Sequence, residues 1–224
     1  DLGLNKNNFF TDISNYLSYE TGQPTHCYDA NKINGKLVFE ESERDEEFYT
    51  LFGKKINLTS RNCVFTINNE VINLAGVVGG NSTSCSKNTK SVIIECAYFQ
   101  PEAIIGKSLK YDIQSEASHK FERGVDPDCH DRVLKRFIKI VEQHSCITNM
   151  SIITHKYKDN PAHQISVDVN KINQIIGINI SEDEYLAYLL KLNFRIDGGV
   201  ITIPSFRSDI KTQNDLAEEV ARAI

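Results

Sequence analysis

The chain has 224 residues, of which 40% are hydrophobic and 25% charged, a composition typical of a globular protein with one or two domains. No apolar run approaches the roughly 18 to 20 residues needed to cross a bilayer, and the N-terminal segment has neither a basic leader nor an apolar signal core, so we expect no membrane association. The net charge of -5 argues against a protein that holds nucleic acid by charge alone, because neutralising phosphates takes many clustered Lys and Arg residues.

The cysteines and the methionine indicate the compartment and the origin of the chain. The six cysteines are scattered, with no CxxC pair and no histidine at zinc-ligand spacing, so we expect reduced thiols in a cytoplasmic protein. The only methionine is Met150. We therefore expect a fragment, or a processed product, of a longer chain.

The first region mixes helices and short strands. Apolar residues recur at helical spacing over residues 9–19, and Gly22 and Pro24 then stop the pattern. Four β-rich runs follow, with a hairpin turn predicted at Asn68-Asn69. The runs cover 36–42, 63–67, 71–78 and 92–99.

Two prolines predict the starts of later helices. Pro101 suits the first turn of a helix through Lys107, and Pro127 that of a longer helix through His144. Because helices and strands alternate without a regular βαβ rhythm, the predicted fold class is α+β.

A polar stretch, YKDNPAHQ, separates this region from a smaller one. We place the boundary there, giving domains at 1–158 and 159–224. The second domain is predicted to contain a strand, a helix closed by Gly177, a helix that Ser181 and Glu184 begin with a capping box, a hairpin and a final helix. These elements cover 164–169, 170–177, 181–194, 194–204 and 212–224.

His26 is the first residue that could carry chemistry. It lies in GQPTHCYD, which we interpret as a tight turn that presents an imidazole able to donate, accept or titrate near neutral pH. A purely structural hydrogen bond is the alternative for a lone histidine.

A glycine-rich segment, LAGVVGGN, follows with Gly76 and Gly79. Glycines let a ligand or another chain approach the backbone closely, although the spacing fits neither the dinucleotide nor the Walker fingerprint. A β-bulge or barrel corner is the structural alternative.

Glu95 is the most unexpected residue in the sequence. It lies in the apolar run VIIECAYF, and a carboxylate in a buried strand is costly unless a partner or a ligand satisfies it. A solvated strand face or an internal ion pair would also explain it.

Two further clusters remain. The segment QSEASHKFERGVDP is predicted to be a loop leading into a helix, and it suits either a polar ligand or its own internal ion pairs. In the second domain, Asp215, Glu218 and Glu219 fall at i, i+3 and i+4 on one helix face, with Asp209 before that helix. Such oxygen-only groups suit magnesium, although acids in a helix's first turns are also favoured by its dipole.

Five ordered segments together resemble a known family along essentially the whole chain. They are GQPTHCYD, LAGVVGG, VIIECAYF, SEASHKFERGVDP and PSFRSDI with DLAEEVAR. The family is the beta subunit of bacterial-type phenylalanyl-tRNA synthetase. The resemblance implies a large mixed α/β editing domain followed by a small winged-helix-like α/β domain.

The function implied by this resemblance is hydrolysis of tyrosine wrongly joined to tRNA(Phe). An apolar synthetic pocket cannot strongly reject a substrate that merely adds one hydroxyl. By the resemblance, Glu95 accepts the phenol O–H in a second pocket, where phenylalanine would leave the carboxylate unsatisfied.

The remaining site residues also follow from the resemblance. His26, Ser115 and Gly79 would position water and polarise the ester carbonyl. Substrate would be bound by Ser14, Asn15, Gly76 and Ala117 together with Glu95. Because no covalent nucleophile is evident, we expect direct attack by water, for which the terminal ribose hydroxyl could assist.

Some residues depart from the family's usual pattern. Ser14 and Ser115 stand where threonine is common, and Glu116 where aspartate is usual, so the lost methyl groups put the efficiency of editing in doubt. Thr25 and Cys27 replace the usual neighbours of His26.

The resemblance also implies partners and a metal. The partners are an alpha subunit with the ATP-dependent synthetic site and tRNA(Phe), in a heterotetramer of two alpha and two beta subunits. Mg²⁺ would bind Asp209, Asp215, Glu218 and Glu219 near the alpha subunit. The alternatives are an assembly and RNA-docking scaffold whose editing pocket has lapsed, and a free-standing trans-editing deacylase.

Overall fold

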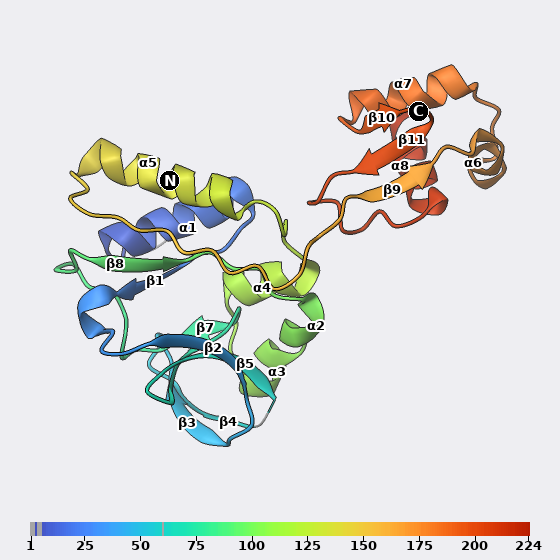
Figure 1. Ribbon diagram of the computed structural model, residues 1–224. Helices are drawn as coiled ribbons and strands as arrows, with labels where there is room; N and C mark the ends of the chain where they lie inside the picture. Colours follow the sequence, from blue (N-terminus) through green and yellow to red (C-terminus); the bar gives the residue numbers. More distant parts are fainter. Residues whose placement is uncertain (1–2, 4–5, 60) are drawn as a thin grey trace. The chain divides into compact units, whose positions relative to one another are not determined.

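The computed structural model describes residues 3, 6–59 and 61–224 (Figure 1). The chain forms two compact units, one of Asp1–Val125 and Cys129–Ser151, the other of Asp126–Asp128 and Ile152–Ile224. The predicted boundary at residues 158 and 159 lies in the stretch without helix or strand that joins them, and it stays a prediction.

The first unit begins with α1 (Phe9–Thr21), for which the Asn8 side chain accepts a hydrogen bond from the Thr11 amide at the N-terminus. Gly22 ends the helix at φ 78°, a left-handed conformation that glycine adopts without a Cβ penalty. Strand β1 (His26–Asp29) and the 3-10 turn η1 (Ala30–Lys32) follow. His26 therefore opens a strand, and the tight turn predicted around it is wrong.

A four-stranded antiparallel sheet forms the centre of this unit, in the order β2 (Leu37–Ser42), β5 (Asn62–Ile67), β6 (Glu70–Leu74) and β7 (Val78–Gly79). The predicted hairpin at Asn68-Asn69 is confirmed, with φ of 51° and 67°, since the twist of a two-residue hairpin requires positive φ at both turn positions. A separate pair, β3 (Glu46–Tyr49) and β4 (Lys55–Leu58), was not predicted.

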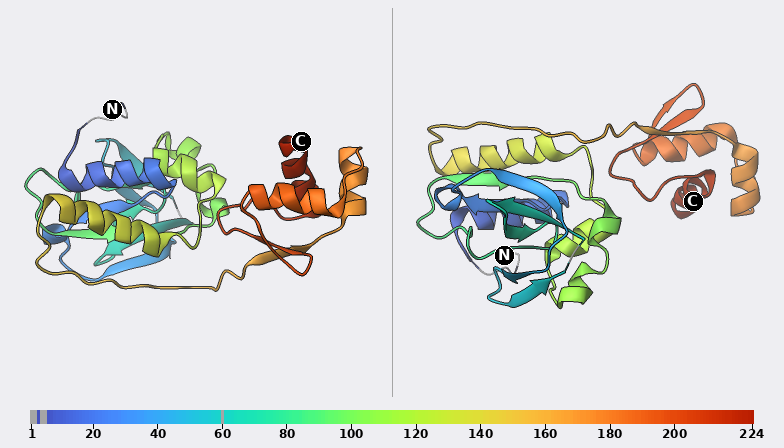
Figure 2. Two further views of the ribbon diagram at one scale, coloured as in Figure 1. Left: turned by 90° about the horizontal axis from the view of Figure 1, so that it is seen from above. Right: turned by 60° about the horizontal axis from the view of Figure 1, so that its bottom comes forward.

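Strand β8 (Val92–Glu95) pairs antiparallel with β1. One face of this pair contributes Cys27, Val92 and Ile94 to a core shared with helices α1 and α5 (His130–His144), whereas Tyr28 and Ile93 join the core around the four-stranded sheet. The two faces alternate because successive strand side chains point to opposite sides. The left view in Figure 2 shows α1 and α5 side by side.

Short helices complete the unit: α2 (Pro101–Ile104), α3 (Lys107–Tyr111) and α4 (Glu116–Arg123). Four predictions are corrected here. The helix predicted over 101–107 breaks at Gly106, which has φ 79°; the predicted loop over 114–127 contains α4; and the helix predicted from Pro127 begins at His130. The strand predicted over 92–99 ends at Glu95.

The second unit follows its predicted plan. A three-stranded antiparallel sheet in the order β10 (Arg195–Asp197), β11 (Val200–Ile203) and β9 (His163–Ser166) packs with three helices around one core. The helices are α6 (Val169–Ile176), α7 (Glu182–Lys191) and α8 (Gln213–Ala223). The predicted capping box of Ser181 and Glu184 is confirmed, as is the end of α6 at Gly177.

The fold class α+β is confirmed, since helices and antiparallel sheets are mixed in both units. Within the described ranges, no helix combines the length and apolar character needed to cross a bilayer.

Candidate functional site

The candidate site lies on the face of the β1–β8 pair that points toward the four-stranded sheet. His26 and Glu95 are opposite each other in the strand register, and Tyr28 lies two residues beyond His26 on the same face. The Tyr28 hydroxyl donates a hydrogen bond of 2.7 Å to Glu95 Oε2. The fold thus brings an imidazole, a phenol and a carboxyl group together from two strands far apart in sequence.

Asn73 of β6 completes this group. Its Nδ2 donates to the Tyr28 hydroxyl at 2.7 Å and lies 3.3 Å from Glu95 Oε2. Tyr28 is 0% exposed and Asn73 4% exposed, so both side chains belong to the core. We call Tyr28, Asn73 and Glu95 the phenol–carboxyl network.

Burial controls the ionisation of Glu95. It raises the pKa of Glu95 from its usual 4.5 to about 7, while the hydrogen bond from Tyr28 acts in the opposite direction. Burial, and next the charge of Glu95, raise the pKa of Tyr28 well above its usual value, so Tyr28 stays a phenol. Glu95 therefore titrates close to neutral pH beside a partner that does not.

His26 is half-buried, and its ring packs against Tyr28 and Gly79. Its ring lies edge-on to Tyr28, with 4.4 Å between ring centroids, and it packs so closely on Gly79 that a Cβ there would lie 2.2 Å from His26 Cε1. Its Nε2 is buried and has no hydrogen-bond partner among the described residues. Burial lowers the pKa of His26 to about 4, so the imidazole is neutral at pH 7.

The structure gives Gly76 and Gly79 different roles. Gly76 has φ 69° in a turn closed by a hydrogen bond from Val77 N to Leu74 O, and the left-handed conformation at the third turn position requires glycine. A Cβ at Gly76 would also lie 2.7 Å from Ile104 Cδ1. Gly76 thus shapes the turn before β7, whereas Gly79 makes room for the imidazole.

Ser14 and Asn15 lie on α1. The Ser14 hydroxyl is within 2.7 Å of both the carbonyl oxygen and the hydroxyl of Thr25, and so fixes the residue immediately before His26. Ser14 is buried, whereas Asn15 is partly exposed.

Ser115 and Ala117 belong to the start of α4. The Ser115 hydroxyl accepts from Ser118 N at 3.0 Å as an N-cap and donates to Val77 O at 2.6 Å. Ala117 packs at the edge of the main core. The structure therefore connects Ser115 to the segment that carries Gly79 and places no hydroxyl of Ser115 at His26 or Glu95.

Sequence reasoning missed Tyr28 and Asn73. Asn73 has the signal that singled out Glu95, since it is a polar residue in the apolar run VINLAGVV. Tyr28 gives no such signal, because tyrosine is ordinary in a strand and its hydroxyl partner lies 67 residues away.

The acidic cluster of the second unit is held together by Arg207. This guanidinium bonds to Asp209 at 2.7 Å and to Glu219 at 2.8 Å. Hydrogen bonds from Arg207 hold the pKa of Asp209 and of Glu219 below its usual value. The positive charge that neutralises these two carboxylates therefore comes from Arg207 of the chain itself.

The other two acids of this cluster also have partners. Asp215 accepts from the backbone N–H groups of Lys211 and Thr212 at 2.9 and 2.8 Å and completes the capping box of α8, and Glu218 pairs with Arg222 at 2.5 Å. Across the described residues, no three His, Cys, Asp or Glu side chains gather as a metal would require. The predicted magnesium ligands do not fit a Mg²⁺ ion as they are placed, because Arg207 occupies two of them.

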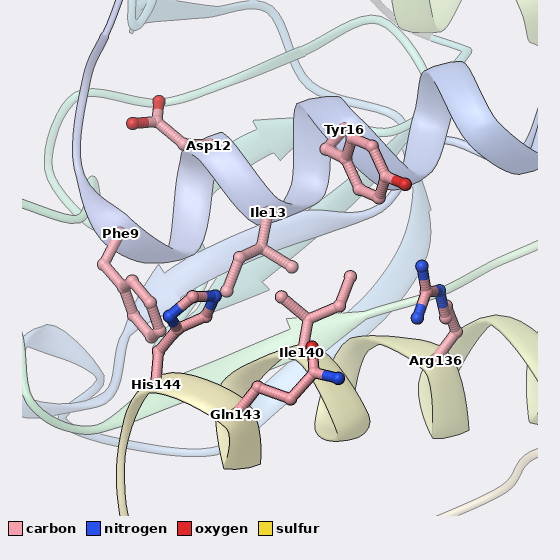
Figure 3. Close-up of a pocket in the computed structure, with 8 residues that line it drawn as sticks. All are labelled: Phe9, Asp12, Ile13, Tyr16, Arg136, Ile140, Gln143 and His144. Atoms are coloured by element: carbon pink, nitrogen blue, oxygen red, sulfur yellow. The ribbon is translucent and has the colours of Figure 1, made fainter.

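A pocket of about 730 Å³ lies elsewhere, between α1 and α5 (Figure 3). It is lined by Phe9, Asp12, Ile13 and Tyr16 of α1 and by Arg136, Ile140, Gln143 and His144 of α5. None of the predicted site residues lines it.

The chain matches two family models. The B3/4 domain model matches residues 2–146, and the tRNA synthetase B5 domain model matches residues 165–224.

Curated relatives match the chain almost from end to end. It is 33% identical over 226 residues to the phenylalanine–tRNA ligase beta subunit of Ehrlichia canis, covering 98% of this chain and 29% of that one. It is 32% identical over 231 residues to the same subunit of Francisella tularensis, again covering 98% and 29%. The chain thus spans less than a third of these relatives' length.

One of the solved structures that the chain resembles has a low TM-score. This is an N-terminal fragment of the phenylalanyl-tRNA synthetase beta subunit from Pyrococcus horikoshii, with 14% identity and a TM-score of 0.44, covering 96% of this chain and 65% of that one. Both domains lie within the stretch that aligns with phenylalanine–tRNA ligase beta subunits. The family models thus show that the chain belongs to the B3/4 domain family and that a B5 domain follows the B3/4 domain.

Proposed function

We propose that the chain is part of the beta subunit of a phenylalanine–tRNA ligase and that its first unit hydrolyses tyrosine from misacylated tRNA(Phe). The observation that carries this proposal is the buried Nε2 of His26, which has no hydrogen-bond partner among the described residues and lies opposite the partly buried Glu95 in the strand register. Buried polar groups are normally hydrogen-bonded. An unpartnered one beside a group that titrates near neutral pH is typical of a binding or catalytic site.

Glu95 supplies the selection of tyrosine. A carboxylate oxygen accepts a hydrogen bond from a phenol, and Glu95 Oε2 does so with Tyr28 at 2.7 Å. The hydroxyl of a tyrosyl ester can donate a hydrogen bond to the other oxygen, whereas a phenylalanyl ester leaves that oxygen unpaired in a desolvated site.

His26 supplies the orientation of water. A pKa of about 4, lowered by burial, makes this imidazole a weak base at pH 7, so it acts by hydrogen bonding. Water attacks the ester carbonyl carbon and loses a proton, the bond from that carbon to the ribose oxygen breaks, and the ribose oxygen takes up that proton. The products are tyrosine and tRNA(Phe). Gly79 makes room for the imidazole itself, since a side chain there would collide with the ring.

The remaining site residues have supporting roles in this proposal. Ser14 holds the segment that carries His26, and Ser115 holds the segment that carries Gly79. Gly76 shapes the turn before β7. Asn15 and Ala117 border the substrate.

In the whole enzyme we expect an alpha subunit with the ATP-dependent synthetic site, binding of tRNA(Phe) and a cytoplasmic location. A Mg²⁺ ion at Asp209, Asp215, Glu218 and Glu219 would require Arg207 to leave Asp209 and Glu219. No step of the hydrolysis depends on that ion.

A scaffold whose editing pocket has lapsed is the second candidate. The observation that favours it is the hydrogen bond from the Tyr28 hydroxyl to Glu95 Oε2, because Tyr28 already occupies one oxygen of the carboxyl group that would select tyrosine. A scaffold has no need to distinguish tyrosine from phenylalanine.

Hydrolysis of Tyr-tRNA(Phe) and Phe-tRNA(Phe) by the complete enzyme tests the proposal. We expect faster hydrolysis of Tyr-tRNA(Phe), loss of that preference in Glu95→Gln, and slower hydrolysis of both esters in His26→Ala. Ser86→Ala, at an exposed hydroxyl whose hydrogen bonds are local, is the control. Equal and slow hydrolysis of both esters by the wild type would establish the scaffold instead.

A further inference from the structure

The phenol–carboxyl network has a fixed direction of hydrogen bonding. The Asn73 Nδ2 group can only donate, and it donates to the Tyr28 oxygen at 2.7 Å. The single proton of the Tyr28 hydroxyl is therefore free to point at Glu95 Oε2, 2.7 Å away. Because Asn73 also lies 3.3 Å from Oε2, two donors converge on one carboxylate oxygen.

This convergence makes the two oxygens of Glu95 unequal. Oε2 is held in its acceptor state by donors from β1 and β6 that are 0% and 4% exposed. A proton on Glu95 must therefore reside on Oε1. Oε1 accepts a hydrogen bond when Glu95 is ionised and donates one when Glu95 is protonated.

We propose that Tyr28, supported by Asn73, is a positioning residue that fixes Oε2 of Glu95 and thereby leaves Oε1 to select a substrate that carries a phenolic hydroxyl. The inference rests on the proposed function and adds residues that act through Glu95 and do not touch the substrate. It also explains why Tyr28 can bond to Glu95 without blocking the site. The Tyr28 phenol orients the carboxylate through Oε2 and leaves Oε1 free to accept a hydrogen bond from the substrate.

The surroundings of Glu95 make Tyr28 decisive for its ionisation. Its titratable neighbours are Tyr28, Cys27 and Cys96, whose pKa values burial raises, that of Cys96 to about 12. His26, opposite Glu95, is neutral because burial lowers its pKa. Of the titratable neighbours among the described residues, Tyr28 is the one that counteracts the burial that raises the pKa of Glu95.

Removing the Tyr28 hydroxyl should therefore weaken selection in two ways. The carboxyl group loses a donor that orients it, and the protonated form, whose Oε1 no longer accepts, becomes favoured at higher pH. Tyr28→Phe retains the ring and its packing against His26, so the change is confined to one hydroxyl.

The test measures the ratio of Tyr-tRNA(Phe) to Phe-tRNA(Phe) hydrolysis between pH 6 and pH 9 in the complete enzyme. Hydrogen bonds to charged groups are strong enough that we expect Tyr28→Phe to lower this ratio about tenfold at pH 7. The ratio should also rise with pH at a higher midpoint than in the wild type. Asn73→Ala should have the same effects to a smaller extent.

Tyr185→Phe is the matched control. Tyr185 is also 0% exposed, but its hydroxyl has no partner among the described residues, so the ratio and its midpoint should stay at wild-type values. Thermal unfolding of each variant shows which are folded at the assay temperature. If Tyr28→Phe is not, Asn73→Ala decides the outcome.

The outcomes separate this inference from the proposed function. If Glu95→Gln loses the preference for tyrosine while Tyr28→Phe and Asn73→Ala keep both the ratio and its midpoint, the proposed function stands and the inference is overturned. A wild-type enzyme without the preference would overturn both.

Discussion

Two groups of acidic side chains, one in each unit, show opposite ways of accommodating carboxylates. Glu95 is enclosed by neutral donors, and burial raises its pKa to about 7. Asp209 and Glu219 surround the guanidinium of Arg207, whose hydrogen bonds hold the pKa of each below its usual value.

The difference shows that residue type alone does not reveal what a carboxylate does. In the first unit, a desolvated acid that titrates near neutral pH is poised to bind a donor. In the second, acids that resemble a metal-binding set are neutralised by an arginine of the same chain, and they help to stabilise the unit.

The largest expected effect is a pH-dependent loss of stability caused by Glu95. Its pKa is raised from 4.5 to about 7 in the folded state, so folded protein binds more protons than unfolded protein between these values. The difference in free energy of unfolding, wild type minus Glu95→Gln, should therefore be highest below pH 4.5. This difference should fall by roughly 3 kcal/mol as the pH rises to about 7.

Urea unfolding of both proteins at several pH values measures this difference. The contribution of His26 to the pH dependence cancels in the difference, because both proteins contain it. A difference that is constant from pH 4 to pH 8 would show that Glu95 is solvated in the folded protein.

The second expected effect is the destabilisation of the second unit by Arg207→Ala. The Glu219 side chain is 12% exposed and would lose its shortest ion pair, that of 2.8 Å, so we expect a loss of about 1 to 2 kcal/mol. Arg222→Ala is the matched control: its side chain is 69% exposed, and exposed ion pairs contribute less, about 0.5 kcal/mol. Hydrogen exchange of the amides of α8 measures both.

Acid and magnesium sharpen this comparison. Because the folded pKa values of Asp209 and Glu219 are lowered, their contribution to stability is present above their usual pKa and lost as the pH falls below it. Arg207→Ala should reduce that loss. MgCl₂ should stabilise Arg207→Ala more than wild type, since the substitution removes the arginine from Asp209 and leaves Glu219 only its longer ion pair with Arg222, of 3.6 Å. An equal effect would mean that Arg207 does not compete with the ion.

The smallest effect is spectroscopic. Because burial lowers the pKa of His26 to about 4, its ring proton resonances should not show the large shift of imidazole protonation between pH 5.5 and pH 8, a range in which only the smaller effect of Glu95 ionisation is expected. Exposed His155 provides the comparison within the same NMR titration. A midpoint near 6.5 for His26 would show that water solvates the ring.

The sequence by itself determined most of the second unit. Its capping box, its helix-ending glycine and its hairpin depend on neighbours within a few residues, and local backbone chemistry decides such elements. In the first unit the same kind of signal correctly placed the Asn68-Asn69 turn. It failed where context overrode it, as at Gly106 and at the end of β8.

The candidate site was predicted in part. Glu95 stood out because a carboxylate in an apolar strand needs a partner, but its partners Tyr28 and Asn73 lie 67 and 22 residues away. Their approach depends on two strand pairings and on the side of each strand that faces the core. Only the tertiary structure decided that Glu95 is held by a phenol from another strand and Glu219 by the guanidinium of Arg207, twelve residues away, because hydrogen-bond partners are set by distance in space and not by separation along the chain.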